Sequence, residues 1–250
     1  SKSCNVAATR ARTFYRAYTT RMSPRKPRPA KTRPVDPDDA NAPWRLFLAV
    51  PVPAEVRDLV ASLTADLAAR DWPVRWVSAA GAHLTLEFLG DTPPERAELL
   101  RLALPEVVAQ HQPFQLRTAG LGVFPNQRRP RVLWLGLHGP VHRLETLQQS
   151  INGVVRQLGF PAEEGDFNPH ITLGRVRNSG TPTVPLRDLP EKVRALLADR
   201  GIDAPNAPPP VPLPVRDVEL VRSHLSHEGA RYETIARFPL ANRSSGSERS

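Results

Sequence analysis

A tetrapeptide of one pattern occurs twice in the chain, and its spacing constrains the fold more than any other feature. His83-Leu84-Thr85-Leu86 and His170-Ile171-Thr172-Leu173 lie 87 residues apart. An apolar segment precedes each tetrapeptide at the same distance, because Leu46 lies 37 residues before His83 and Leu133 lies 37 residues before His170. Self-similarity at a fixed period indicates two copies of one supersecondary unit. We therefore expect two pseudo-symmetric lobes, each built from a strand, a helix and a second strand.

Strand geometry predicts which side chains of each tetrapeptide share a face. Successive side chains of a strand point to opposite faces, so His83 shares a face with Thr85 and His170 shares one with Thr172. The apolar residues between them then point into the core. Two such strands in symmetric lobes are expected to direct two imidazoles and two hydroxyls at one cleft.

This set of groups suits acid and base catalysis on a phosphodiester. An imidazole with an ordinary pKa of about 6.5 can serve as acid or base near neutrality. Threonine hydroxyls can stabilise charge on the non-bridging oxygens without a metal. Arg175 could add a bidentate contact to the phosphate. Simple alternation puts Arg175 on the face opposite His170, so this role requires a turn or bulge after Gly174.

Hydrophobic periodicity predicts a mixture of helices and strands along the chain. Alternation within residues 83–88 places Glu87 on the face of His83 and Phe88 on the opposite face. Pro105 is expected to interrupt or kink its helix. The Pro-rich segment 205–214 is expected to be an extended spacer or a lid. The predicted strands cover residues 45–53, 83–88, 114–125, 131–139, 167–176, 215–224 and 232–240, and the predicted helices cover 54–70, 91–110, 142–159 and 189–200.

The distribution of charge defines the predicted domains. The net charge of +9 invites a nucleic-acid interpretation, but residues 1–43 and 242–250 carry eight of these nine charges. Residues 44–241, which contain both tetrapeptides, are nearly neutral. We expect 1–43 to be a disordered basic arm, 44–241 to be a two-lobed domain, and 242–250 to be a disordered tail. Met22 is the only methionine, so residues 1–21 could lie upstream of the natural start.

Composition excludes several classes of protein. The longest apolar runs fall far short of the roughly 18 residues that a membrane helix needs. The single cysteine, Cys4, cannot form an internal disulfide or a thiolate zinc site. A cytoplasmic protein without a membrane contact is expected.

At these motifs the chain resembles the two-histidine (2H) phosphoesterase superfamily, and within it the RNA 2′,3′-cyclic phosphodiesterases, also called LigT-type 2′-5′ RNA ligases. The resemblance covers about residues 44–241 and includes RLFLAVPVP, HLTLEFLGD, RPRVLWLG, FNPHITLGR and a closing Ser-x-Leu…Gly-x-x-Tyr segment. It implies an α+β fold with two antiparallel sheets flanking a central cleft and helices on the outside. It also implies metal-independent opening of a 2′,3′-cyclic phosphate at an RNA end to a 2′-phosphate, without a cofactor.

The resemblance also implies roles for five residues. It makes His83 the proton donor and His170 the proton acceptor; the repeat itself is too symmetric to decide between them. Thr85, Thr172 and Arg175 match the phosphate contacts of the superfamily. The implied partner is RNA with a cyclic phosphate end, and we expect a monomer with no obligate protein partner.

Other functions stay open from sequence. The same site could run in reverse and join a cyclic phosphate to a 5′-hydroxyl. A non-catalytic module that binds RNA ends would use the basic arm for phosphates. A metal enzyme is a third class, because His138 and His142, or His224 and His227, have plausible ligand spacing, although neither pair has an evident third ligand.

Several side chains have two interpretations. Phe124 and Trp134 could stack on a base, but an aromatic residue in a strand is more often part of the core. A basic loop with Arg128, Arg129 and Arg131 could contact RNA phosphates or be solvated.

Overall fold

The computed structural model describes residues 42–69, 72–125, 130–161, 165–177, 211–225 and 230–241. All the elements below belong to the unit Pro43–Ser250. The predictions for the basic arm up to residue 41, the helix 189–200, most of the Pro-rich segment 205–214, Arg128, Arg129, His227 and the tail 242–250 lie outside these residues.

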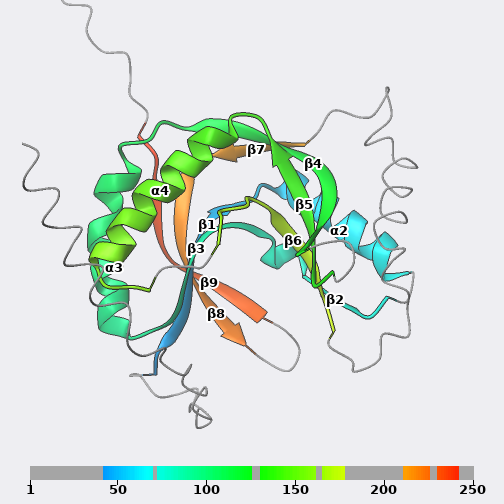
Figure 1. Ribbon diagram of the computed structural model, residues 1–250, viewed down its shortest axis with the longest axis horizontal. Helices are drawn as coiled ribbons and strands as arrows, with labels where there is room; N and C mark the ends of the chain where they lie inside the picture. The colour runs from blue at the N-terminus through cyan, green and yellow to red at the C-terminus, as the bar shows by residue number, and fades with distance from the viewer. Residues whose placement is uncertain are drawn as a thin grey trace, which may run out of the picture. The chain divides into compact units, whose positions relative to one another are not determined.

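Nine strands of the described part of the chain form one curled, antiparallel sheet (Figure 1). Their order is β7-β4-β5-β6-β3-β1-β8-β9, and β2 also pairs with β6. The constant spacing predicts two copies of one unit, and in each copy the two strands form an antiparallel pair, β1 with β3 and β5 with β6. The strands are β1 Trp44–Pro51, β2 Val74–Trp76, β3 His83–Thr92, β4 Phe114–Phe124, β5 Val132–His138, β6 Ile171–Val176, β7 Pro212–Val215, β8 Asp217–Leu225 and β9 Ala230–Pro239.

The mixed fold agrees with the predicted α+β class, but the strands do not form two separate sheets. The two motif strands, β3 and β6, are neighbours and join the halves through one residue pair, Leu84 with Ile171. These are the apolar residues that directly follow the two motif histidines, so the connection brings the two copies of the motif together.

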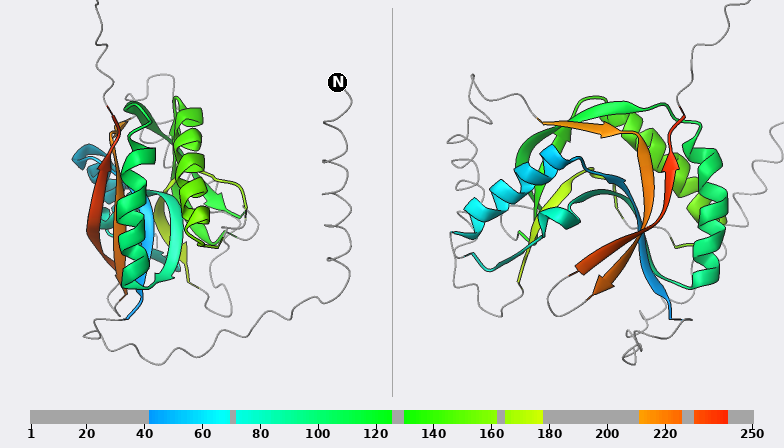
Figure 2. Two further views of the ribbon diagram at one scale, coloured as in Figure 1. Left: turned by 90° about the vertical axis from the view of Figure 1, so that its left-hand side faces the viewer. Right: turned by 180° about the vertical axis from the view of Figure 1, so that it is seen from behind.

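Three α-helices in the described residues cover one face of the sheet. They are α2 Ala54–Ala68, α3 Pro94–Val108 and α4 Val141–Gln157. α2 packs on β2, β6 and β7, whereas α3 and α4 lie side by side (Figure 2). Pro105 does not end α3, because the helix continues and the Ala109 N–H donates to the Pro105 carbonyl at 3.0 Å.

The main hydrophobic core lies between the helices and this face of the sheet. Leu84, Leu86, Ile171 and Leu173 from the motif strands are all buried in it. A separate small cluster of Phe47, Ala49 and Val221 is buried on the other face. The motif leucines and isoleucine therefore point to the helices, as alternation predicts, and leave the opposite face to the polar motif residues.

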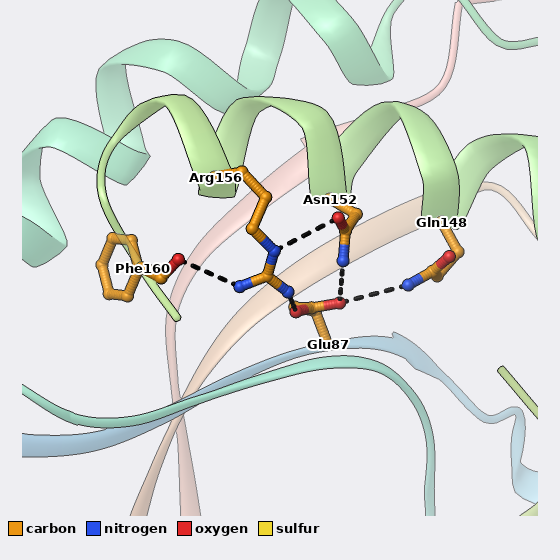
Figure 3. A network of polar contacts seen from close by, with 5 residues as sticks. All are labelled: Glu87, Gln148, Asn152, Arg156 and Phe160. Atoms are coloured by element: carbon orange, nitrogen blue, oxygen red, sulfur yellow. Dashed lines mark hydrogen bonds and ion pairs between the residues drawn. The ribbon is translucent and has the colours of Figure 1, made fainter. Parts of the chain in front are cut away.

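A bulge in β3 reverses the predicted faces of Glu87 and Phe88. Leu48 pairs with Glu87 but Ala49 pairs with Thr85, so Leu86 is an extra residue on β3. Glu87 is consequently buried beneath α4 with no exposed surface, where it accepts hydrogen bonds from Gln148 and Asn152 and pairs with Arg156 (Figure 3). Phe88 is 46% exposed and contacts Phe47 on the motif face.

The end of the predicted Pro-rich spacer forms the edge strand β7. β7 pairs with the first residues of β4, and the Thr118 side chain accepts a hydrogen bond from the Val211 N–H at 3.0 Å. Proline lacks a backbone donor, so it is tolerated in a sheet mainly on edge strands. Pro212 and Pro214 satisfy this rule because β4 is the only neighbour of β7 in the sheet order of the described residues.

Candidate active site

The first motif histidine is held by the turn that precedes its strand. A short 3-10 turn, η1 Ala79–Gly81, leads into β3, and His83 is the first residue of this strand. The His83 Nδ1 lies 2.7 Å from the Gly81 carbonyl oxygen. Because a carbonyl can only accept, Nδ1 carries the proton, and Nε2 is the nitrogen free to exchange one.

The second motif histidine is held in the same way. His170 directly precedes β6, and its Nδ1 lies 2.7 Å from the carbonyl oxygen of Asn168. Both imidazoles thus donate from Nδ1 to the carbonyl two residues earlier in the chain. The two copies of the motif therefore share the imidazole tautomer as well as the sequence pattern.

The pairing of β3 with β6 brings the two motifs to one place. Leu84 is directly opposite Ile171 in an antiparallel register. Continued by one residue in each direction, this register sets His83 opposite Thr172 and Thr85 opposite His170. Residues opposite each other on neighbouring strands have Cβ atoms about 4.5–5.5 Å apart. The two imidazoles and two hydroxyls therefore form a compact group on the face away from the helices.

Burial lowers the pKa of both histidines. For His83, burial is the largest effect; the hydrogen bond to Gly81 opposes it, and the charges of His170 and Arg175 lower the pKa further. For His170, burial again comes first, the bond to Asn168 opposes it, and Arg175 lowers the pKa further. With both values below 6.5, both rings are mainly neutral at pH 7 in the free protein.

Arg175 reaches the motif face through the bulge that its predicted role requires. Leu133 pairs with Gly174 but Trp134 pairs with Thr172, so Leu173 is the extra residue on β6. The bulge thus lies before Gly174 and not after it.

A Cβ atom on Gly174 would lie 2.5 Å from Val74 Cγ1, so the close approach of β2 to β6 requires glycine here.

Aromatic side chains flank each histidine, and the sequence interpretation missed part of this arrangement. The rings of Phe47 and Tyr232 lie 4.6 and 5.0 Å from the His83 ring. The rings of Phe124 and Trp134 lie 5.0 and 6.4 Å from the His170 ring.

The sequence marked these aromatic residues to different degrees. Phe47 lies within an apolar run whose faces look alike in sequence, so nothing marked it. Tyr232 belongs to the closing segment of the resemblance. Phe124 and Trp134, which strand statistics assign to the core, are instead half-buried beside His170.

The described members of the two candidate metal-ligand pairs are His138, His142 and His224, and they belong to no metal-binding group of described residues. Within the ranges that the structure describes, no three histidine, cysteine, aspartate or glutamate side chains are placed to hold a metal ion. His224 is instead paired with Glu233, its Nε2 being 2.7 Å from Glu233 Oε2.

No helix among the described residues is long and apolar enough to cross a membrane.

Comparison with known proteins places this geometry in a family. An RNA 2′,3′-cyclic phosphodiesterase of Methanothermobacter thermautotrophicus is 35% identical over 197 residues, which cover 78% of this chain and 98% of that protein. A protein of the same name from Geobacillus stearothermophilus is 33% identical over 195 residues, and here the chain spans only 56% of its relative.

Solved structures show the same fold. The crystal structure of TT0787 from Thermus thermophilus covers 80% of this chain and 100% of its own, with a TM-score of 0.61 and 28% identity. E. coli LigT in complex with 3′-AMP covers 80% and 99%, with a TM-score of 0.57 and 25% identity. The model of the LigT like phosphoesterases matches residues 50–134 and 137–232, so the chain belongs to the LigT-like phosphoesterase family of the 2H superfamily.

Proposed function

We propose that this protein hydrolyses 2′,3′-cyclic phosphate ends of RNA to 2′-phosphomonoesters. One observation carries the proposal: two partly buried imidazoles, each with Nδ1 bonded to a backbone carbonyl, meet on neighbouring strands with two threonines. Each ring then has Nε2 free for proton transfer. The relatives named RNA 2′,3′-cyclic phosphodiesterases, two of which are 33% and 35% identical, support this substrate class.

In the proposed reaction, His170 is the base and His83 is the acid. Neutral His170 accepts a proton at Nε2 from a water molecule, whose oxygen forms a new bond to phosphorus. The bond between phosphorus and the ribose O3′ breaks, and protonated His83 donates its Nε2 proton to O3′. The products are a 2′-phosphate and a free 3′-hydroxyl, and one water is consumed.

Thr85, Thr172 and Arg175 stabilise the phosphate in this proposal. The threonine hydroxyls donate to the non-bridging oxygens, where charge grows during the attack. The Arg175 guanidinium neutralises the same oxygens, because its charge lies close enough to lower the pKa of both imidazoles. No metal or cofactor takes part. Each half of the sheet contributes one motif, so both halves serve one RNA end.

The lowered pKa of His83 has a consequence for the acid role. The free protein holds His83 mainly neutral at pH 7, whereas the acid must be protonated before it donates. A bound phosphodiester carries a negative charge beside the ring, and an opposite charge nearby favours the imidazolium form. Substrate binding is therefore expected to raise the pKa of His83 and prepare the donor.

Product analysis with a short RNA that ends in a 2′,3′-cyclic phosphate tests the proposal. The expected product is the 2′-phosphate, formed equally well with a chelator present. His83→Ala and His170→Ala should each lower kcat by about 10²- to 10⁴-fold. Full activity in either variant, or a 3′-phosphate product, would contradict the assigned roles.

Separate measurements distinguish reverse ligation and a non-catalytic RNA-binding function from the proposed hydrolysis. Reverse 2′-5′ ligation is expected to be minor in water, and a sealing assay with concentrated ends measures it. A non-catalytic RNA-binding module would bind the same RNA without turnover, with an affinity that falls steeply with salt and survives loss of both histidines.

A further inference from the structure

Two arginines face each other across neighbouring strands at the edge of the candidate site. Arg75 of β2 is directly opposite Arg175 of β6 in an antiparallel register. Opposite residues project from the same face, with Cβ atoms about 4.5–5.5 Å apart. Both side chains are exposed. Arg75 therefore lies beside the arginine whose charge affects both motif histidines.

No carboxylate neutralises this pair within the described residues. Two other arginines have acidic partners, since Arg156 pairs with Glu87 and Arg237 pairs with Glu219. Neither Arg75 nor Arg175 has a hydrogen bond or ion pair to an acidic side chain in the part of the chain described here. Like charges directly opposite each other destabilise a sheet. A bound anion would remove this repulsion, so the pair favours an anionic ligand.

Backbone bonds hold Arg75 in place. The Val77 N–H donates to the Leu173 carbonyl at 2.9 Å, and the Arg177 N–H donates to the Pro73 carbonyl at 2.7 Å. These bonds flank Arg75 on both sides and fix β2 against β6. A binding group on a paired strand is more closely positioned than one on a loop. The backbone of Arg75 is therefore held in a fixed position beside the candidate site.

Arg75 is not needed to neutralise the cyclic phosphate at the end of the substrate. That group carries one negative charge, which Arg175 can neutralise. β3 pairs with β6 at Ile171, next to His170, whereas Arg75 of β2 pairs with Arg175, four residues farther along β6, so Arg75 lies toward the end of β6 away from the imidazoles. In an RNA strand, the next negative charge belongs to the phosphodiester that joins the last two nucleotides.

We propose that Arg75 binds this adjacent phosphodiester, so that the protein prefers an oligonucleotide with a cyclic end to a cyclic mononucleotide. The inference rests on the proposed function and adds to it a substrate length. Arg75 and Arg175 then hold two successive phosphates of one strand. Each guanidinium can donate two parallel N–H bonds to phosphate oxygens.

The experiment compares three substrates with a 2′,3′-cyclic end. They are a mononucleotide without a 5′-phosphate, a dinucleotide, and the same dinucleotide with a neutral methylphosphonate linkage. In Arg75→Ala we expect kcat/KM on the dinucleotide to fall about tenfold through KM, the scale of one charged hydrogen bond. On the mononucleotide the change should stay within about twofold. The methylphosphonate should cost the wild type about tenfold and cost Arg75→Ala nothing more.

Two variants serve as controls. Arg101→Ala makes the same change of charge on α3, which packs on the opposite face of the sheet, and should leave all three substrates unaffected. Arg75→Lys keeps the charge without the planar fork and should recover part of the loss.

Three results would overturn the inference. They are an equal loss on the mononucleotide and dinucleotide, no loss on either, or a wild type insensitive to the methylphosphonate. The last measurement needs no variant, so it decides the matter even if Arg75→Ala does not fold. Hydrolysis of the mononucleotide by the wild type separates these results from a failure of the proposed function, which would abolish turnover of every substrate.

Discussion

Replacing Arg156 by alanine should remove a large part of the stability of this fold. Glu87 has no exposed surface, and Arg156 provides the positive charge that compensates its carboxylate (Figure 3). Loss of one partner of a buried ion pair typically costs about 3–5 kcal/mol. We expect the lower end, about 3 kcal/mol, because Gln148 and Asn152 still donate to Glu87 and 24% of the Arg156 side chain is exposed. Such a loss is large for a domain whose free energy of unfolding is typically about 5–15 kcal/mol.

The magnitude depends on an uncompensated charge, and a double variant isolates that cause. Arg156 also donates to the Phe160 carbonyl at 3.1 Å, a bond that any substitution removes. Changing Glu87→Leu together with Arg156→Leu removes both charges, and it should cost less than Arg156→Ala alone. If the loss came only from the hydrogen bonds of Arg156, the double variant would be at least as unstable.

Urea unfolding followed by circular dichroism measures these differences. Arg101→Ala is the matched control, because Arg101 pairs with Glu98 on the surface, with about half of each side chain exposed. Exposed pairs contribute little to stability, so this control should unfold like the wild type. A change in Arg156→Ala as small as that in Arg101→Ala would refute the reasoning, since Glu87 would then be compensated in another way.

Four further predictions concern the candidate site, the packing of β2 against β6 and the basic arm. Because burial lowers the pKa of His83 and His170, kcat/KM should peak below pH 6.5 and fall above it as the donor loses its proton; a maximum above pH 7.5 in a pH–rate profile would contradict this. The unfolded chain, with ordinary histidine pKa values of about 6.5, binds more protons in acid, so burial of these imidazoles should lower the free energy of unfolding as pH falls below 6.5. Gly174→Ala would place Cβ 2.5 Å from Val74 Cγ1, and thermal unfolding should report a loss of about 1–3 kcal/mol. Deleting residues 1–43 should leave kcat unchanged and reduce only the salt-dependent part of RNA affinity, so a lower kcat in steady-state assays would show that the arm acts in the chemical step.

Much of the fold could be predicted because it depends on local periodicity. The repeated unit of strand, helix and strand corresponds to the pairs β1 with β3 and β5 with β6, and its constant spacing is visible in the sequence. Alternation also assigned His83, Thr85, His170 and Thr172 to one kind of face. The short strand β2 was missed, because three residues are too few to show a period.

The faces of Glu87, Phe88 and Arg175 could not be predicted from alternation. Each lies beyond a bulge, where one extra residue on a strand shifts all later side chains to the other face. The sequence interpretation recognised that Arg175 needed such a shift but placed it after Gly174. Whether a strand bulges depends on the hydrogen bonds of its neighbours, which local sequence does not contain.

The sequence by itself determined the residue types of the candidate site: two His-x-Thr motifs in equivalent strands, with their apolar partners directed to a core. Only the tertiary structure decided how these groups meet. The single pair Leu84 with Ile171 connects the halves into one sheet, and bulges at Leu86 and Leu173 bury Glu87 and bring Arg175 to the site. Side-chain type and spacing are local properties of the chain, whereas strand register is set by hydrogen bonds between residues far apart in sequence.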